Sequence, residues 1–164
     1  MKKEALLIAT IIKNGLVVTE TGASQQDIRI ENGRFAAIET QIAPAPEDTV
    51  IDAAGKIVLP GVIDSHVHFH MPTATGFNAD DFTSGSACAA IAGTTTVVDF
   101  ASPIEGEPLS AGLAARIGEA QGNCHVDFAL HMEITGDFPM DLAGLPALKE
   151  MGLLASYESP EHAA

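Results

Sequence analysis

Two histidines separated by one residue, His66 and His68, are the residues whose types and spacing most directly indicate chemistry. They end a largely apolar run that starts at Gly61, and side chains alternate faces along a strand, so both imidazoles would point to the same side. Two neutral imidazole nitrogens so placed can chelate one ion, and they suit Zn²⁺ and its neighbours. The chain contains six histidines, so a chance pair of surface histidines is the alternative.

The elements that would position this pair alternate between strand and helix after Pro60. The patterns predict strands over 61–68, 94–100 and 126–131, and helices over 81–92, 109–120 and 142–151. This alternation predicts a parallel sheet, and a His-x-His pair at the end of its first strand favours a TIM-type (β/α)8 barrel.

Residues before Pro60 carry a different pattern, in which short strand-like runs are separated by turns. These runs are 6–12, 16–19, 28–30 and 35–38. The Asn32-Gly33 pair predicts a two-residue hairpin. The start MKKEALLIATII has the look of a short secretory signal, but no A-x-A-like site follows, which favours a first strand. The expected fold class is therefore α/β, an incomplete TIM-type barrel preceded by a small all-β sandwich module.

Composition limits the classes of partner. The chain is 46% hydrophobic and 18% charged, which is typical of a globular domain. Its formal charge of −14 argues against a nucleic-acid or anionic-membrane surface, and no segment is long enough to span a membrane. Cys88 and Cys124 lie far apart without metal-type spacing, so we expect buried thiols in a reducing, cytoplasmic compartment.

Several segments together point to a known family. GKIVLPGVIDSHVHFHMP, DDFTSGSACAAIAGTTTVVDF and DFALHMEIT, preceded by IIKNGLVVT and DIRIENGRFAAI, resemble the opening of amidohydrolase-superfamily enzymes in the branch of dihydropyrimidinases and hydantoinases. The resemblance runs from about Ile11 to about Gly152. It implies an N-terminal β module that is part of a composite sandwich (1–59), the first βα units of a hydrolase barrel (60–152) and a divergent tail (153–164).

The resemblance also implies roles for single residues. His66 and His68 would be the first-strand ligands of a site that is binuclear for zinc in the full-length family, and partial here. Met71 would line the substrate pocket, although an ordinary loop methionine is the alternative. Asp64 is expected to be a structural hydrogen-bonding carboxylate rather than a metal ligand, His70 a loop histidine and His131 a satisfied structural histidine. Asp99 is expected to be a helix-cap or loop carboxylate, with support of the metal ligands from behind as the alternative.

The chain is short for a whole barrel, which takes about 250 residues. The residues after Pro60 supply about half of one. In the family a fourth-strand lysine bridges two metal ions; by alignment from Gly152 it would fall near Tyr157, and Lys149 lies in the preceding helix. A fragment, a frameshift and real divergence all remain open.

The function implied is metal-assisted hydrolysis of the cyclic amide bond in dihydropyrimidines or hydantoins, with a small cyclic ureide as substrate and a homo-oligomer as the assembly. This chain alone would be inactive. The alternatives are a non-catalytic scaffold relative of the same fold, an allantoinase-type ureide hydrolase and a small metal-binding protein. The dihydroorotase pattern has an arginine shortly after the histidine pair, where it holds a substrate carboxylate. Residues 69–72 contain no arginine, so a dihydroorotase is disfavoured.

Overall fold

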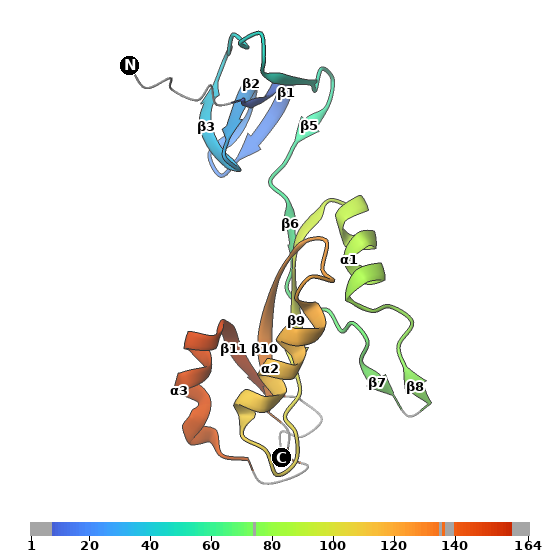
Figure 1. Ribbon diagram of the computed structural model, residues 1–164. Helices are drawn as coiled ribbons and strands as arrows, with labels where there is room; N and C mark the ends of the chain where they lie inside the picture. The colour runs from blue at the N-terminus through green and yellow to red at the C-terminus, as the bar shows by residue number, and fades with distance from the viewer. Residues whose placement is uncertain (1–7, 74, 135, 137–139, 159–164) are drawn as a thin grey trace. The chain divides into compact units, whose positions relative to one another are not determined.

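In the computed structural model, residues 8–73, 75–134, 136 and 140–158 are described. The chain divides into two compact units, Met1–Pro60 and Gly61–Ala164. The described part of the first unit is all-β, whereas the second combines strands with helices (Figure 1). The whole is therefore a mixed α/β protein.

The first unit is built on one five-stranded sheet. Its strands are β1 (Thr10–Thr19), β2 (Gly22–Glu31), β3 (Arg34–Glu39), β4 (Thr49–Asp52) and β5 (Ile57–Val58). β1 pairs antiparallel with β2 and parallel with β4 and β5. Asn32 (φ 51°) and Gly33 (φ 71°) join β2 to β3 with the positive φ angles of a type I′ turn, which confirms the hairpin. Within residues 8–60 the strands form this one sheet, so the expected sandwich is not confirmed.

β1 is one strand where the patterns predicted two, at 6–12 and 16–19. Residues 6 and 7 lie outside the described residues. A β-bulge between Ile12 and Gly15 shifts the pairing with β2, and Asn14 takes a left-handed conformation there (φ 60°). A bulge breaks the two-residue alternation of side chains, and for that reason the pattern concealed the continuity of the strand.

The second unit contains a four-stranded parallel sheet in the order β11-β10-β9-β6. Its elements in chain order are β6 (Val62–Asp64), the hairpin of β7 (Pro72–Thr73) and β8 (Gly76–Phe77), α1 (Phe82–Ile91), β9 (Thr94–Ala101), α2 (Leu109–Ala120), β10 (Asp127–Ile134), η1 (Leu142–Gly144), α3 (Leu145–Leu148), η2 (Lys149–Met151) and β11 (Leu153–Glu158). The predicted alternation of strands and helices, and the parallel sheet, are confirmed.

Two expectations about these elements were wrong in detail. β6 has three residues, so the candidate histidines lie in the segment that follows it and not in a strand over 61–68. The helix predicted over 142–151 is split into η1, α3 and η2, with Pro146, which has no backbone N–H to donate, at the start of α3. β11 starts at residue 153, where a divergent tail was expected, and it pairs with β10 and adds a fourth strand to the sheet; the divergence of this tail stays a prediction.

Local sequence explains where α1 begins and ends. Asp81 caps its N-terminus by accepting a hydrogen bond from the Ser84 N–H (2.8 Å), while the Ser84 hydroxyl accepts one from the Asp81 N–H (3.1 Å). The bond from the Ser84 N–H is the main cause that lowers the pKa of the Asp81 carboxyl below its usual value. Gly93 (φ 89°) then ends the helix in a left-handed conformation, as predicted.

The helices lie on one face of the sheet, with α2 between α1 and α3 (Figure 1). Two apolar clusters fill the layer between the helices and the sheet. One contains Ala101, Leu109, Leu113, Leu130, Met132, Leu148 and Leu153. The other contains Phe69, Phe82, Val97 and Ala120, and thereby anchors the chain just after the candidate histidines.

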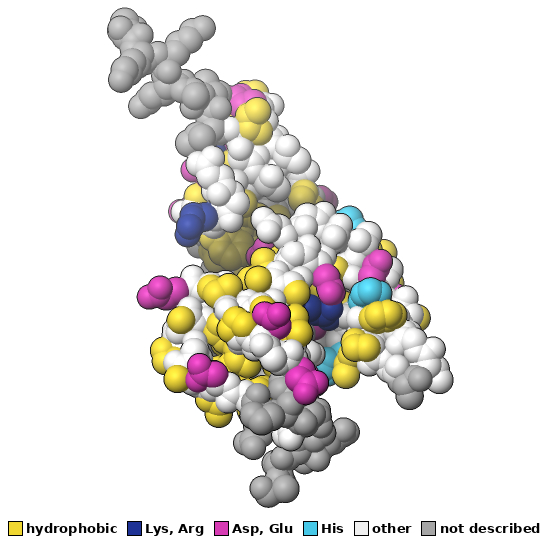
Figure 2. All heavy atoms as spheres, turned by 60° about the horizontal axis from the view of Figure 1, so that its bottom comes forward, with side chains coloured by type: hydrophobic (Ala, Val, Ile, Leu, Met, Phe, Trp, Pro, Cys, Tyr) yellow, Lys and Arg dark blue, Asp and Glu magenta, His cyan; other side chains and the backbone are white. Residues whose placement is uncertain are grey.

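On the surface shown in Figure 2, acidic side chains are scattered among hydrophobic ones and basic side chains are few. Contrary to expectation, Cys88 is exposed on α1, and Cys124 is only partly buried. None of the described helices is long and apolar enough to cross a membrane.

Candidate metal centre

The imidazoles of His66 and His68 converge just beyond the C-terminal end of β6. Their Nε2 atoms lie 3.2 Å apart, and their ring centroids 5.0 Å. Zn²⁺ in tetrahedral coordination, with Zn–N bonds of about 2.0–2.1 Å, holds two ligand nitrogens about 3.3 Å apart. The spacing of the two Nε2 atoms therefore fits two adjacent positions around one ion, although the histidines follow the strand rather than end it.

Phe100 on β9 is the surface against which these rings rest. Its ring centroid lies 4.6 Å from that of His66 and 4.7 Å from that of His68. His131 on β10 is in register with Phe100, and their centroids are 5.3 Å apart. The expectation that His131 would be satisfied was wrong, because its Nδ1 atom is buried without a hydrogen-bond partner among the described residues.

The segment that carries the two histidines is held by side chains as much as by the sheet. The β6–β9 ladder ends at Asp64, and beyond it the Val67 N–H donates to the Val98 carbonyl (3.0 Å). The exposed Asp64 carboxylate accepts from the His66 backbone N–H (3.2 Å), in keeping with the structural role expected of it. Asp64 therefore shapes the turn into the histidine pair.

Asp99 lies on β9, with a fully buried side chain paired to Arg116 of α2 (2.8 Å). The expectation of a helix-cap or loop carboxylate was wrong. Asp99 has the opposite side-chain direction to its neighbour Phe100, as alternation along a strand requires, so it faces α2 while Phe100 faces the imidazoles.

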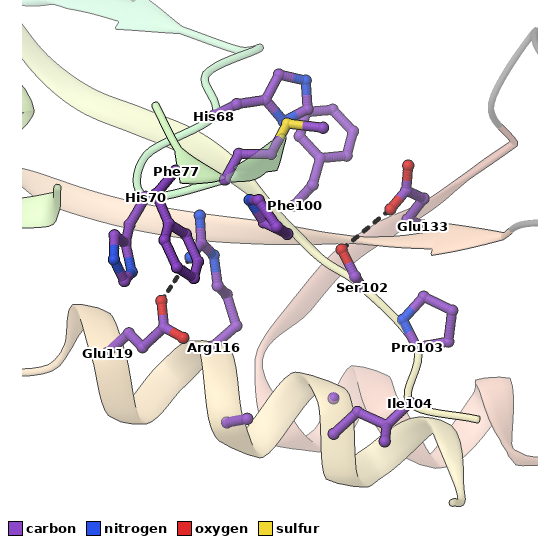
Figure 3. Close-up of a pocket in the computed structure, with 14 residues that line it drawn as sticks. His68, His70, Phe77, Phe100, Ser102, Pro103, Ile104, Arg116, Glu119 and Glu133 are labelled. Atoms are coloured by element: carbon purple, nitrogen blue, oxygen red, sulfur yellow. Dashed lines mark hydrogen bonds and ion pairs between the residues drawn. The ribbon is translucent and has the colours of Figure 1, made fainter. Parts of the chain in front are cut away.

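A cavity of ≈ 280 Å³ opens beside His68. Met71, Phe77 and Phe100 give it an apolar wall, and Ser102 and Glu133 form a hydrogen-bonded polar pair (3.1 Å) on another side (Figure 3). Apolar walls with a few polar groups are typical of small-molecule sites. Met71 thus lies where a substrate-contacting residue would be, and its contact with substrate stays a prediction.

His70 is also in the wall of this cavity, in a left-handed conformation (φ 45°). Its ring stacks on Phe77 at 4.2 Å with 14° between the planes, and its N–H donates to the Asp80 carbonyl (2.6 Å). His70 is the expected loop histidine, and it fixes the β7–β8 hairpin beside the cavity.

The candidate metal ligands that converge here are the two imidazoles of His66 and His68. Across residues 8–158, leaving out the undescribed positions, no group of three His, Cys, Asp or Glu side chains could hold a metal ion. Tyr157 lies on β11 in register with Glu133, at the position where the resemblance puts a bridging lysine, and Lys149 lies in η2. The residues present therefore fit part of a metal site.

Sequence reasoning missed Phe100, Arg116 and the Ser102–Glu133 pair. Arg116 stands three residues before Glu119 on one helix, and its bond to Glu119 (2.6 Å) is the exposed i,i+3 pairing that such spacing ordinarily indicates. Only the tertiary structure shows its second contact, to Asp99. For Phe100 the available signal was its place at the end of a strand, next to a carboxylate.

Comparisons with known proteins agree with these observations. The chain is 43% identical over 149 residues to a D-hydantoinase of Streptomyces coelicolor, covering 88% of this chain and 31% of the relative. A dihydropyrimidinase of Arabidopsis thaliana is 40% identical over 125 residues, covering 76% of this chain and 23% of the relative. The chain thus spans under a third of the length of these curated relatives. No family model matches it.

Solved structures of the same kind superpose on this fold. A D-hydantoinase crystal structure matches with a TM-score of 0.82 and 36% identity, over 88% of this chain and 31% of the other. A dihydropyrimidinase from Brevibacillus agri matches with a TM-score of 0.74 and 35% identity, over 79% and 28%.

Proposed function

Because this chain is a relative of the hydantoinases and dihydropyrimidinases and matches their N-terminal portion, we propose that it forms the opening part of a metal-dependent hydrolase of cyclic amide bonds in dihydropyrimidines or hydantoins. The observation that carries the proposal is the 3.2 Å approach of the His66 and His68 Nε2 atoms at the end of a parallel strand. The active sites of TIM barrels lie at this end of the strands, so the second unit is proposed to be the first part of such a barrel.

The residues of this chain would do the following. His66 and His68 would hold a divalent ion, with zinc proposed because imidazole is a common zinc ligand. When bound, the metal would polarise the amide carbonyl and activate water for attack. Met71, Phe77 and Phe100 would pack against the ring of a small cyclic ureide and exclude water from it. The assembly is proposed to be a cytoplasmic homo-oligomer.

A chimera tests the proposal. Residues 11–152 of this chain replace the matching segment of the Streptomyces coelicolor D-hydantoinase, and hydantoin, dihydrouracil and allantoin are assayed. We expect hydrolysis of hydantoin or dihydrouracil, and its loss on His66→Ala. His125→Ala is the matched control, since the exposed His125 contacts Ser86 through its backbone N–H. A chimera whose activity survives His66→Ala would contradict the proposal, and preference for allantoin would favour the allantoinase alternative.

A non-catalytic scaffold relative is the second candidate, and Tyr157 at the position of the bridging lysine favours it. A second chimera, with the junction after Glu158, carries Tyr157 into the hydrolase. Activity with the junction at Gly152 and none with the junction at Glu158 would favour the scaffold, because this chain's own β11 would then be the defect.

A further inference from the structure

We propose that Asp99 and Arg116 form a clamp that fixes the backbone at Phe69 and thereby positions the imidazoles of His66 and His68 for metal binding. The two residues are positioning residues, because neither is a ligand of the proposed ion. The inference rests on the proposed function, since it concerns the same metal centre.

The Asp99 carboxylate joins two separate segments of the chain. Its Oδ2 atom accepts from the Phe69 N–H (2.9 Å), in the residue directly after His68. Its Oδ1 atom accepts from the Phe100 N–H (2.5 Å) and from Arg116 Nη2 (2.8 Å). A fully buried carboxylate needs such donors, because its desolvation is otherwise unfavourable.

Arg116 completes the clamp from the side of α2. Its Nη2 atom donates to the Phe69 carbonyl as well as to Asp99, so the two side chains together hold both the N–H and the C=O of Phe69. Its guanidinium carbon lies 4.7 Å from the centroid of the Phe82 ring, and only 11% of the side chain is exposed. Figure 3 shows Arg116 reaching from α2 towards His70 and Phe100.

The side chain of Phe69 is fixed as tightly as its backbone. It is buried against Phe82 with centroids 5.4 Å apart, and a Cβ atom on Gly85 would lie 2.2 Å from the Phe69 Cε1 atom. Asn78 adds a further tie, since its amide donates to the His68 carbonyl and accepts from the Met71 N–H (2.7 Å). The clamp therefore acts on a segment with little room to move.

The imidazoles depend on this clamp because the regular pairing with β9 ends before them, although the Val67 N–H between them still donates to the Val98 carbonyl (3.0 Å). The β6–β9 ladder ends at Asp64, before either histidine. Through Phe69 the clamp sets the backbone of His68, and through the Phe100 N–H it sets the residue that both imidazole rings contact. The Asp99 carboxylate thus fixes the segment that carries His66 and His68 relative to Phe100, the residue that their rings contact.

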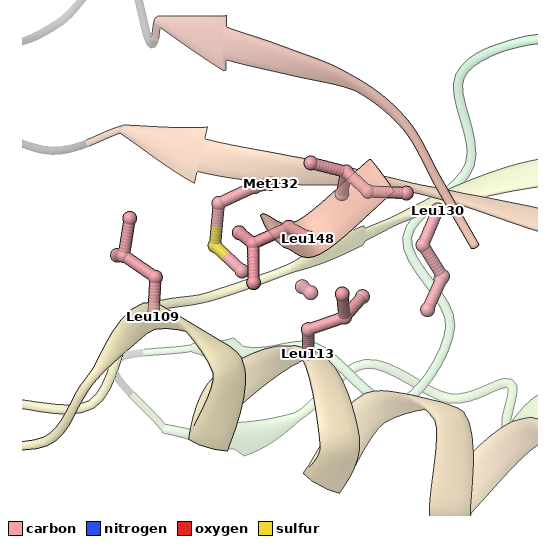
Figure 4. Close-up of a cluster of buried hydrophobic side chains, with 7 residues drawn as sticks. Leu109, Leu113, Leu130, Met132 and Leu148 are labelled. Atoms are coloured by element: carbon pink, nitrogen blue, oxygen red, sulfur yellow. The ribbon is translucent and has the colours of Figure 1, made fainter. Parts of the chain in front are cut away.

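The same face of α2 anchors the clamp to the core, because Leu109 and Leu113 lie seven and three residues before Arg116 and therefore on its side of the helix. Leu109 and Leu113 of this helix pack with Leu130, Met132 and Leu148 (Figure 4). This cluster is distinct from the one around Phe69. Leu148→Ala would therefore weaken the fold without touching the clamp, which makes it a matched control for stability.

The experiment measures zinc affinity by chelator competition, and hydrogen exchange of the Phe69 amide in metal-free protein, for the 164-residue chain. We expect Arg116→Met and Asp99→Asn to weaken zinc binding by about 10-fold or more, as loss of a partner behind metal ligands typically does. Both should speed exchange at Phe69. Arg116→Lys keeps the charge but not the forked geometry, so it should fall between wild type and Arg116→Met. Leu148→Ala should lower stability and leave zinc affinity unchanged.

Unchanged zinc affinity and unchanged Phe69 exchange in Arg116→Met and Arg116→Lys would overturn the clamp. An equal loss of affinity in Leu148→Ala would overturn it too, because general destabilisation would then account for the effect. If the wild-type chain binds no zinc, or binds it without His66 and His68, the proposed metal centre fails instead. The clamp is then judged on Phe69 exchange alone: faster exchange in Asp99→Asn supports it, and unchanged exchange refutes it.

Discussion

The partners of individual side chains in this protein are not shown by their immediate neighbours in sequence. His66 and His68 were recognisable from their spacing, but the spacing does not show that both rings contact Phe100, which lies on another strand. Asp27 in the first unit is the same kind of case. It is buried, and its partners come from two separate places in the chain, Lys13 with Asn14 on β1 and Ile42 after β3.

Asp27 gives a pH-dependent prediction. Burial by itself would raise the pKa of its carboxyl, but hydrogen bonds from Lys13 (2.7 Å), the Ile42 N–H and the Asn14 N–H (both 2.8 Å), together with the Lys13 charge, lower it from 3.8 to about 2. Because the folded pKa is depressed, the stabilisation from ionised Asp27 is present above pH 3.8 and is lost as the pH falls towards 2. We expect the side-chain carboxyl ¹³C shift to titrate near pH 2, and Lys13→Met to raise that midpoint. A wild-type midpoint at or above 3.8 would refute the arrangement.

At the scale of elements, α2 links the core to the candidate metal centre. Its close approach to the loop after β9 requires glycine at 112, where an added Cβ would lie 2.2 Å from the Ser102 carbonyl oxygen. Gly118 on the same helix has nothing within 4 Å of its Cβ position. The two glycines therefore differ in packing while sharing a helix.

Gly112→Ala should lower the free energy of unfolding by about 1–3 kcal/mol, because the Ser102 backbone must move to admit the methyl group. Gly118→Ala should raise it by up to about 1 kcal/mol, since alanine is the better helix former. Urea denaturation followed by circular dichroism measures both. Equal effects of the two substitutions would show that α2 does not approach Ser102 as closely as described.

At the scale of the whole chain, the described residues supply part of a site and a sheet with two open edges. β6 pairs only with β9, and β11 only with β10, among the described strands. Val62 and Ile63 on β6 are 54% and 65% exposed. Unpaired edges and exposed apolar side chains favour association.

We expect the 164-residue chain to oligomerise or aggregate as salt is raised, because screening weakens the repulsion from its −14 charge. Light scattering over a salt series measures this. Ile63→Lys, which places a charge on the open edge strand, should reduce association, with the exposed Ile91→Lys on α1 as the comparison. A monodisperse monomer with one sharp thermal transition would contradict the expectation and favour a small, complete protein.

The same chain should hydrolyse neither dihydrouracil nor hydantoin at a measurable rate. Among the described residues no group of three His, Cys, Asp or Glu side chains could hold a metal ion, so water activation and proton transfer would lack the groups they need. A spectrophotometric assay with added zinc is the test. Turnover that falls on His66→Ala would show that the active site is more complete than the two imidazoles.

The sequence by itself determined the order and type of most elements. The ends of α1 were readable because Asp81, Ser84 and Gly93 are local signals, and the bounds of α2 were predicted as 109–120, as observed. The histidine pair was readable because its spacing is two residues, and the family because several motifs occur in order. All of these signals act between neighbours in the chain.

Tertiary structure alone decided what depends on distant neighbours. The bulge at Asn14 and the early end of β6 follow from pairing with other strands. The pattern of apolar residues along the sequence therefore predicted the bounds of both strands wrongly. Arg116 carried no expectation and Asp99 was expected to be a helix-cap or loop carboxylate, whereas the fold brings α2 against β9 and buries both groups together. Burial makes a charge depend on its partners, and which groups are buried together is set by packing between elements far apart in sequence.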